Sequence, residues 1–372
     1  MTLLCWDDRF AIHDTGNAAL YLYEGGLVQG TLPHVDNPER SLRMREVIRR
    51  AGLDPVLDIV APTPATPAQV ERAHSNEHVA RMSAISRAGG GDGGGGYTPM
   101  DGRSYDLALL SAGSAITAVR AVVEGSAPNA YAMLRRAGHH ASREMGFGFC
   151  IFNNVAVAAR TAQSELGVDR IAIVDIDVHH GNGTEAIFAQ DASVLTVSLH
   201  QDRMFPPDTG GVEVVGGVAG AGRNVNLPLP GGTGDAAYQL ALDRIVAPVL
   251  REFAPELIIV ACGLDASVFD PMARLAVTAQ GFAGIADRLL ALAENICSGR
   301  IAFIQEGGYS PAYAPFCGLA IVEAMAGVGD RHADPFEDFL APSLRELAGY
   351  QRDAVEGLAR EHTRRWPSIA TD

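Results

Sequence analysis

The sequence predicts an α/β protein in which a central, mostly parallel sheet is flanked by helices on both faces. Short apolar runs of strand length recur along the chain, and alanine-rich stretches with helical spacing separate them. Polar residues, histidines among them, gather where the apolar runs end. Fully apolar runs are typical of strands buried on both faces, and strands that alternate with helices are typical of a parallel sheet.

Five strands and five helices follow from these patterns. We expect strands over residues 129–134, 171–178, 194–200, 257–262 and 301–305. We expect helices over residues 107–123, 155–166, 236–253, 279–296 and 316–325. Pro315 precedes the last helix, at a position where proline begins a helix but cannot continue one. No Pro- or Ser-rich linker divides the 372 residues, so we expect one domain over residues 1–372, with a helical tail over about 328–372.

Composition excludes several classes of protein. Apolar residues make up 47% of the chain and charged residues 20%, which excludes a disordered protein. The formal net charge is −15, from 44 acidic and 29 basic residues, and every basic residue is arginine. An acidic surface repels phosphate backbones and anionic lipid headgroups, so we expect neither nucleic-acid nor membrane binding.

Cysteine usage and the N-terminus bear on the compartment. The five cysteines include no CxxC pair, a pattern that fits a reducing compartment. Residues 1–10 carry two aspartates and lack the apolar core of a signal peptide. We find no apolar stretch of the roughly 20 residues that cross a bilayer. The expected location is therefore cytoplasmic.

The segment 171–184, IAIVDIDVHHGNGT, carries the strongest chemical signal. Residues two apart on a strand project from the same face, so Asp175, Asp177 and His179 lean the same way. Asp177 and His179 form an incomplete zinc site, and Asp265, at the end of the 257–262 strand, is the best candidate for a third ligand. Three protein ligands leave a fourth position open, as in catalytic zinc sites.

Two further motifs stand at strand ends. His139 and His140 are adjacent and point in different directions, so we expect them to play different parts, with Asp175 as a partner for one of them. In QEGGY, residues 305–309, two glycines allow a sharp turn that presents the Tyr309 hydroxyl to the crevice. A phenol placed there can donate a hydrogen bond to a developing oxyanion.

Aromatic residues and a glycine-rich loop are candidates for the substrate rim. Phe149 and Phe205 fall on loops near the histidines and could wall a narrow slot for an extended chain. Residues 89–96, GGGDGGGG, lack the GK[ST] of a phosphate-binding loop. This loop, with Asp92 as its one sizeable side chain, is either a mobile surface loop or part of the rim.

Taken together, the motifs resemble the histone deacetylase family. GHH, GFCIFNN, DIDVHHGNGT, a single aspartate after an apolar strand, and EGGY occur in this order in that family. The resemblance extends over residues 37–327 and is strongest to class II deacetylases, bacterial histone deacetylase-like amidohydrolases and acetylpolyamine amidohydrolases. It implies the arginase–deacetylase fold, which agrees with the predicted sheet.

The resemblance also implies a role for each motif residue. It makes Asp177, His179 and Asp265 the ligands of one Zn²⁺. It pairs His139 with Asp175, makes His140 a general base and then a general acid, and gives Tyr309 the task of polarising the scissile carbonyl. It implies a substrate tunnel that includes Gly148, Phe149 and Phe205, with Asp92 as a candidate rim residue. It implies a K⁺ site formed by Asp175, Asp177, His179, Ser198 and Leu199.

Two departures from the family pattern carry predictions. Asn182 stands where class I members have an aspartate, and an amide cannot stabilise an imidazolium as a carboxylate would, so His140 should be less basic than in class I. Relatives place prolines before GHH, whereas this chain has Arg135, Arg136 and Ala137. We expect a more flexible and more cationic rim there.

The leading hypothesis is a zinc amidohydrolase that removes a short acyl group, such as acetyl, from acyl-lysine or an acylated polyamine. The alternatives are a hydrolase of another small amide or ester, including xenobiotics, and a non-catalytic zinc-containing module that binds acyl-lysine. An arginase-like ureohydrolase is disfavoured because DASVFDP, residues 265–271, lacks a second aspartate two positions after Asp265. Since bacterial relatives are often dimers or tetramers, the resemblance also implies a homo-oligomer.

Overall fold

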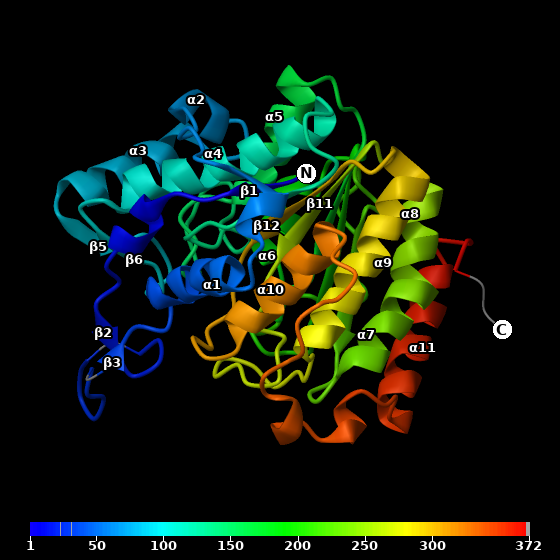
Figure 1. The fold of residues 1–372 in the computed structure, drawn as a ribbon. Coiled ribbons are helices and arrows are strands. Elements are labelled where there is room, and N and C mark those ends of the chain that lie inside the picture. Colours follow the sequence, from blue (N-terminus) through cyan, green and yellow to red (C-terminus); the bar gives the residue numbers. More distant parts are fainter. Residues whose placement is uncertain (23, 31, 370–372) are drawn as a thin grey trace.

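The computed structural model describes residues 1–22, 24–30 and 32–369, and its centre is an eight-stranded sheet (Figure 1). The strand order is β10-β9-β8-β11-β12-β7-β1-β4, and every neighbouring pair is parallel. These strands are β1 (Thr2–Cys5), β4 (Leu57–Val60), β7 (Ala130–Ala132), β8 (Ile171–Asp175), β9 (Val194–Gln201), β10 (Asn224–Leu229), β11 (Leu257–Cys262) and β12 (Ile301–Gln305). The predicted fold class is confirmed.

All five predicted strands lie next to one another in this sheet, and the three that the sequence did not reveal lie at its two sides. β1 and β4 have four residues each, too few to form a distinct apolar run. β10 carries Asn224 and Asn226 on buried positions and Pro228 near its end, which interrupts the apolar pattern. Two short antiparallel hairpins stand apart from the sheet: β2 (Asn17–Ala18) with β3 (Leu32–Pro33), and β5 (Gly90–Asp92) with β6 (Pro99–Asp101).

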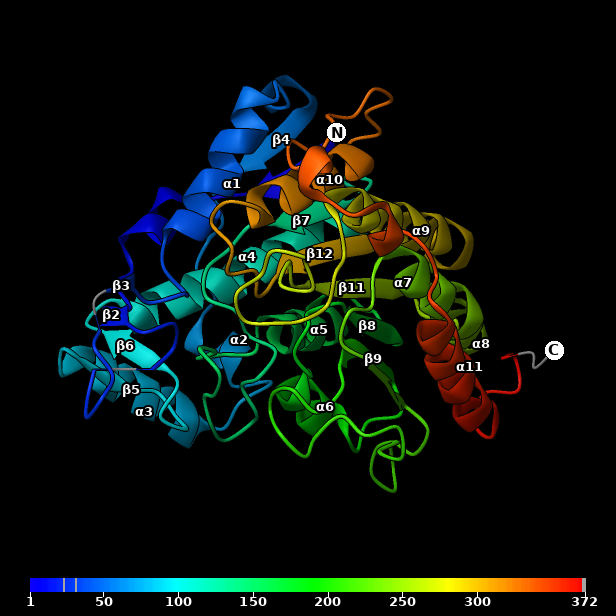
Figure 2. The ribbon, with the colours of Figure 1, turned by 90° about the horizontal axis from the view of Figure 1, so that it is seen from below.

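Helices cover both faces of the sheet (Figure 2). α4 and α5 pack together on one face, while α9, α10 and α1 form the layer on the other. The helices are α1 (Glu39–Arg50), α2 (Pro67–Val70), α3 (Asn76–Arg87), α4 (Ser104–Val123), α5 (Asn154–Glu165), α6 (Asn182–Phe188), α7 (Asp235–Ala241), α8 (Ala247–Phe253), α9 (Ala279–Cys297), α10 (Ala314–Met325) and α11 (Gly349–Thr363). Short 3₁₀ turns span Asp8–Ile12, Asp54–Val56, Glu337–Phe339 and Pro342–Leu344.

The helix predicted over residues 236–253 is continuous but not uniform. A π-helical turn, Leu242–Val246, joins α7 to α8, and Pro248 stands at the start of α8. Pro248 has no N–H to donate to the preceding turn, and a wider turn accommodates the missing bond.

One expectation about apolar stretches is wrong. Within the described ranges, α4 is one helix that has the length and apolar composition to cross a membrane. However, 72% of its most apolar window is buried inside the fold, where Gly113 lets the helix approach a neighbouring segment closely. A Cβ atom at Gly113 would lie 2.0 Å from the Thr63 carbonyl oxygen. The apolar character of α4 is therefore that of a core helix.

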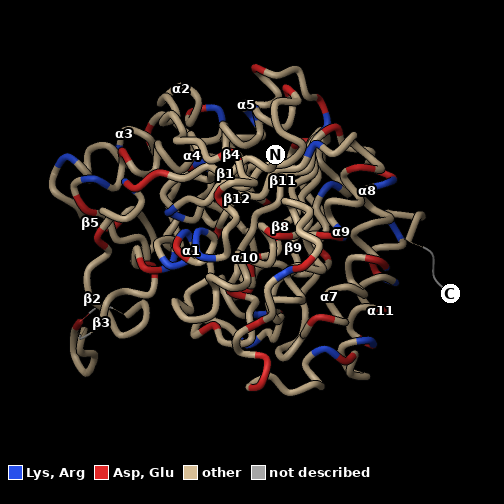
Figure 3. Tube along the Cα trace, in the orientation of Figure 1, with Lys and Arg blue, Asp and Glu red and all other residues tan. Residues whose placement is uncertain are grey.

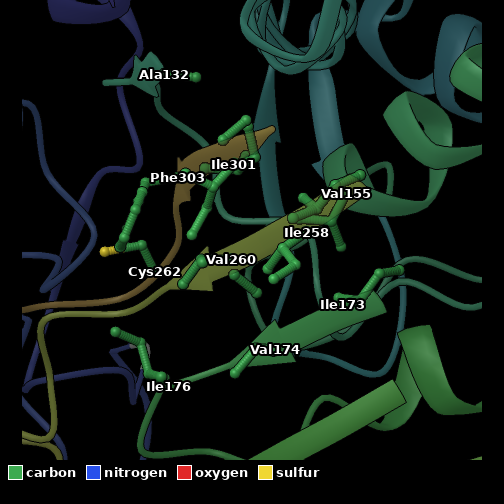
Figure 4. Packing of buried hydrophobic residues seen from close by; sticks show 14 of the residues in the cluster. Ala132, Val155, Ile173, Val174, Ile176, Ile258, Val260, Cys262, Ile301 and Phe303 are labelled. Atoms are coloured by element: carbon green, nitrogen blue, oxygen red, sulfur yellow. The ribbon is translucent and has the colours of Figure 1, made fainter. Parts of the chain in front are cut away.

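The core is continuous across the middle of the sheet (Figure 4). Val174 of β8, Val260 of β11 and Phe303 of β12 are fully buried, and neighbouring residues of the same strands are buried on the opposite face. These strands therefore have apolar contacts on both faces, as their uninterrupted apolar runs predict. The rigid layer fixes the carboxyl ends of the strands, where ligands bind in parallel α/β sheets.

The C-terminal segment packs on the β10 side of the sheet. The Gln351 side chain donates to the Gly232 carbonyl oxygen at 2.8 Å, and His362 Nε2 lies 2.9 Å from the Asn226 carbonyl oxygen. The predicted helical tail contains α11 and two short 3₁₀ turns joined by irregular segments, and its last three residues, 370–372, lie outside the described residues. Acidic and basic residues are mixed over the outer elements, and five of the arginines belong to α1 (Figure 3).

Candidate active site

β8 and β11 bring the predicted metal ligands together. Asp177 and His179 follow the end of β8, and Asp265 follows the end of β11, the strand that pairs with β8. One ligand atom from each residue lies within 4.8 Å of the other two. His179 Nδ1 is 3.0 Å from Asp177 Oδ1 and 3.3 Å from Asp265 Oδ2, and all three residues are buried.

Backbone N–H groups hold the two carboxylates in place. The Gly307 N–H donates to Asp177 Oδ2 at 2.8 Å, and the Val178 N–H donates to Asp265 Oδ1 at 2.9 Å. Gly307 must be glycine, because a Cβ atom there would lie 1.9 Å from Asp265 Oδ2. That second oxygen of Asp265 is buried and accepts no hydrogen bond of acceptable geometry from the described residues.

The electrostatics of this group demand a positive charge. Burial lowers the pKa of His179, but the contact with Asp177 and the nearby negative charges of Asp177 and Asp265 outweigh burial and raise that pKa to about 10. Two carboxylates buried beside one imidazole are costly unless a cation compensates them. Two carboxylate oxygens and one imidazole nitrogen also match the donor set of a zinc site with an open position. The three residues therefore fit a divalent metal ion.

The two adjacent histidines have different partners. His139 Nδ1 lies 2.9 Å from Asp175 Oδ2, and His140 Nδ1 lies 2.7 Å from Asn182 Oδ1. The two rings are 4.0 Å apart between centroids. Asp175 is thus the partner of His139, as the resemblance implied, and Asn182 is the partner of His140.

The pKa values of the pair move in opposite directions. Burial lowers the pKa of His139, but the charges of Asp177 and Asp175 raise it well above its ordinary value. Burial and the neighbouring histidines hold the pKa of His140 well below its ordinary value. Groups whose environments separate their pKa values in this way divide acid and base tasks between them. His140 is the member that remains neutral and able to accept a proton.

Glu306 is a buried residue whose role the sequence did not reveal. Its Oε2 atom accepts hydrogen bonds from the Gly138 N–H at 2.5 Å and from the His139 N–H at 3.2 Å. Burial raises its pKa to about 8, although His139 opposes this. The carboxyl group therefore joins the strand-end turn of β12 to the loop that carries both histidines.

Tyr309 is fixed from two sides. Its backbone N–H donates to Asp270 Oδ2 at 2.7 Å, and the Arg40 guanidinium lies 4.7 Å from the centre of its ring. The Arg40 side chain also donates to the Gly308 and Glu306 carbonyl oxygens, both at 2.7 Å. Burial raises the pKa of Tyr309 well above its ordinary value, so the phenol stays protonated and can donate a hydrogen bond.

These residues open onto a cavity of about 550 Å³. His140, His179 and Tyr309 form part of its wall, and the remainder is mostly apolar or aromatic. The other lining residues are Leu20, Tyr21, Tyr97, Phe147, Gly148, Phe149, Met204, Phe205, Pro207, Pro271, Met272 and Arg274. A cavity of this size with few polar groups is typical of a small-ligand site.

Three phenylalanines contribute to the aromatic wall of the cavity. Phe149 and Phe205 both line the cavity, but the ring stacked on Phe205 is that of Phe147, at 5.2 Å and an interplanar angle of 9°. Phe149 instead makes T-shaped contacts with Tyr309 and His34, with ring centroids 5.8 Å and 4.8 Å apart. Phe147 is thus a third phenylalanine of the cavity wall, one that the sequence analysis did not single out.

Gly148, which stands between Phe147 and Phe149 in the sequence, has a positive φ of 53°. A Cβ atom there would lie 2.5 Å from the His140 ring. Glycine is therefore required at this position by both backbone conformation and space.

The structure bears on two expectations about the rim and contradicts that of a more cationic rim. Asp92 is exposed and does not line the cavity, because its carboxylate accepts the N–H groups of Gly96 at 2.8 Å and Thr98 at 3.0 Å within its own hairpin. Arg135 and Arg136 are each 1% exposed, so they add no charge to the rim. The Arg136 guanidinium instead donates to the Phe149 carbonyl oxygen at 2.8 Å.

The residues of the implied K⁺ site lie on adjacent strands. β8 and β9 pair with Asp175 opposite Ser198, which is followed by Leu199. Asp177 and His179 continue from the end of β8. The Ser198 hydroxyl is 2.9 Å from His200 Nδ1. The strand register thus brings the two segments of the implied site, residues 175–179 and 198–199, side by side.

Comparison with known proteins gives a consistent result. The profile described as "Histone deacetylase domain" matches residues 34–325. A histone deacetylase-like amidohydrolase from Pseudomonas aeruginosa is 41% identical over 97% of this chain and 96% of its own length. A probable deacetylase from Archaeoglobus fulgidus is 37% identical over 90% of this chain and 94% of its own length. The crystal structure of the HDA15 HD domain covers 99% of this chain and 96% of its own, with a TM-score of 0.86 and 29% identity.

Proposed function

Because the chain belongs to the histone deacetylase family, we propose that this amidohydrolase uses zinc to remove a short acyl group, such as acetyl, from an amine such as acyl-lysine. The observation that carries the proposal is the buried group of Asp177, His179 and Asp265, of which His179 lines the same cavity as His140 and Tyr309. Asp177, His179 and Asp265 would hold the zinc ion. When bound, it would supply Lewis-acid polarisation of the amide carbonyl and acidification of the attacking water.

The histidine pair moves the protons. His140, neutral because of its low pKa, accepts a proton from the water that attacks the amide carbon. Asn182 orients the His140 ring through the 2.7 Å contact at Nδ1, which leaves Nε2 free for this transfer. The same ring then returns the proton to the departing amine. His139, with Asp175, stays protonated beside it and favours the neutral form of His140 between turnovers.

Tyr309 stabilises the charge that develops on the carbonyl oxygen. The phenol keeps its proton, and its position in the cavity wall beside His179 lets it donate to that oxygen. Arg40 and Asp270 hold the tyrosine in place before substrate arrives. The aromatic residues around the cavity exclude water from the acyl chain.

We extend the proposal to the parts that follow from the resemblance. K⁺ would bind at the Asp175 and Ser198 ends of β8 and β9. A homo-oligomer is supported by the exposed leucines of the β2–β3 arm, among them Leu27 and Leu32. A single catalytic domain is supported by the packing of α11 on α7 and β10. The five free, buried cysteines support a reducing, cytoplasmic location.

The test is hydrolysis of a panel of acetyl-lysine peptides, acetylated polyamines, anilides and simple esters, with and without a zinc chelator. We expect turnover of at least one amide, loss of that turnover with chelator, and recovery on adding zinc. Asp265→Asn should abolish turnover, whereas Asp353→Asn, which removes an exposed carboxylate on α11, should not. Turnover that resists chelation, or stoichiometric zinc with no hydrolysis of any amide or ester, would contradict the proposal.

A further inference from the structure

The charge of the cavity wall is one-sided. Among the described residues, its lining includes no aspartate or glutamate, and Arg274 is the one that always carries a charge. An acylated polyamine brings further ammonium groups to such a cavity, whereas an acyl-lysine side chain brings a neutral amide. The wall therefore treats the two substrate classes differently.

Arg274 is held at the cavity by its backbone. Its N–H donates to Gln201 Oε1 at 2.8 Å, at the end of β9, and its carbonyl oxygen accepts the Gly232 N–H at 2.6 Å. The guanidinium donates to the adjacent Ala273 carbonyl oxygen and pairs with no carboxylate in the described part of the chain. The side chain is exposed, so its charge is available to a ligand at the mouth.

Two acidic residues of neighbouring segments, Asp270 and Asp92, make their hydrogen bonds elsewhere. Asp270 is buried, and its two oxygens accept the N–H groups of Met272 at 2.8 Å and Tyr309 at 2.7 Å. Asp92 serves its own hairpin. Neither carboxylate lines the cavity, so neither is placed to receive an ammonium group of a substrate.

We propose that Arg274 sets the charge preference of the mouth, so that the enzyme acts on acyl-lysine in neutral or acidic peptides in preference to acylated polyamines. This inference rests on the proposed amidohydrolase function. The aromatic wall opposes it in part, because the faces of Tyr97, Phe147 and Phe205 attract ammonium groups. That attraction is weaker than an ion pair with a carboxylate. An ammonium group that loses its hydrating water without gaining a carboxylate partner is destabilised.

The experiment compares kcat/KM for four substrates at low and high salt. They are a blocked neutral acetyl-lysine peptide, the same peptide with aspartate or with arginine flanking the acetyl-lysine, and N-acetylated spermidine. For the natural enzyme we expect the aspartate peptide to exceed the neutral one, and the neutral one to exceed the arginine peptide, by about two- to fivefold at each step. The polyamine should fall below the neutral peptide, and high salt should reduce the differences between the peptides.

Variants distinguish the effect of the Arg274 charge on substrate preference from the effect of the protein's overall negative charge. Arg274→Gln should bring the three peptides to similar kcat/KM, and Arg274→Glu should reverse their order. Arg203→Gln removes a cation whose side chain is 87% exposed and which does not line the cavity, and it should leave the order unchanged. Equal kcat/KM values for the three peptides in the natural enzyme would overturn the inference while the deacetylase function stands. So would an order of kcat/KM values that persists in Arg274→Gln. Failure to hydrolyse the neutral peptide and every other amide would overturn the proposed function itself.

Discussion

Replacing Asn182 with aspartate should move the acidic limb of the activity–pH profile to higher pH. In the natural chain, burial and the neighbouring histidines hold the pKa of His140 well below 6.5, and only a neutral amide contacts its Nδ1 atom. A carboxylate at that position would stabilise the imidazolium and raise the pKa of His140. His140 must be neutral to accept a proton. With a higher pKa it becomes protonated earlier as the pH falls, so the loss of activity on acidification begins at a higher pH.

The magnitude follows from the distance. Asn182 Oδ1 lies 2.7 Å from His140 Nδ1. With the charges spread over each group, their centres would be about 4 Å apart, which corresponds to about 4 kcal/mol at an effective dielectric of about 20. At about 1.4 kcal/mol per pKa unit this is an upward shift of roughly three units, the upper end of the range for such pairs. We expect a displacement of the acidic limb by about one to three units.

The assay is kcat/KM for a neutral acetyl-lysine peptide from about pH 4 to 10. The variant should keep its fold, because residue 182 opens α6, where a negative charge is favourable. Asn295→Asp adds the same charge on an exposed position of α9 and should leave the profile in place. An acidic limb that does not move in Asn182→Asp would refute the assignment of His140 as the base whose protonation limits activity.

The remaining predictions concern Tyr309, the metal ligands and the aromatic wall. Tyr309→Phe should lower kcat by about 10²- to 10³-fold, because it removes one oxyanion donor while the ring and the fold remain; an unchanged kcat would exclude the phenol from the reaction. Zinc at a hundredfold excess over its Kd should raise the unfolding free energy of chelated protein by about 2.7 kcal/mol in thermal or urea denaturation. Asp265→Ala should remove that increment, and its persistence would place the ion elsewhere. Phe147→Ala should raise KM for acyl-lysine peptides more than it lowers kcat, because it removes the stacking partner of Phe205; a loss confined to kcat would contradict a role in binding.

Most of the sheet could be predicted because its central strands are buried on both faces. β8, β11 and β12 each begin with at least four consecutive apolar residues, and β9 carries polar residues among its apolar ones. The boundaries of all four strands agree with the prediction to within three residues. β1 and β4 are too short for such a signal, and β10 combines asparagines with a proline. α1 and α3 were not predicted, since each buries only part of a largely polar surface.

The metal ligands and the histidine pair could be predicted because each lies within a short motif beside a strand end. Phe147 could not be distinguished from Phe149, because which ring meets Phe205 depends on the turn at Gly148. Glu306 stood inside a recognised motif, but its contacts are to residues 138 and 139, far away in the sequence. Such long-range pairing has no local pattern.

Arg135 and Arg136 were expected at the rim because arginine is normally exposed. In the fold, both guanidinium groups donate to backbone carbonyl oxygens. Arg135 donates to the His13 carbonyl oxygen at 2.8 Å, and Arg136 donates to the Pro99 carbonyl oxygen at 2.6 Å. Asp36, about a hundred positions earlier, supplies the carboxylate that offsets their charge. The Arg135 Nε atom lies 3.4 Å from it. Only the tertiary structure brings these segments together.

This buried charge layer explains how the loops around the site are held relative to each other. Arg40 donates to Asp36 at 2.5 Å and also holds the backbone of the 306–309 turn, while Arg136 lies 3.9 Å from the same carboxylate and holds Phe149. Burial opposes the ionised form of Asp36, but the surrounding arginines outweigh it and lower its pKa. One carboxylate therefore ties together the loops that present Tyr309 and the phenylalanines. Where a proline would restrict the backbone of one loop alone, a shared ion-pair layer fixes two loops relative to each other. That relative placement is what transition-state stabilisation requires of them.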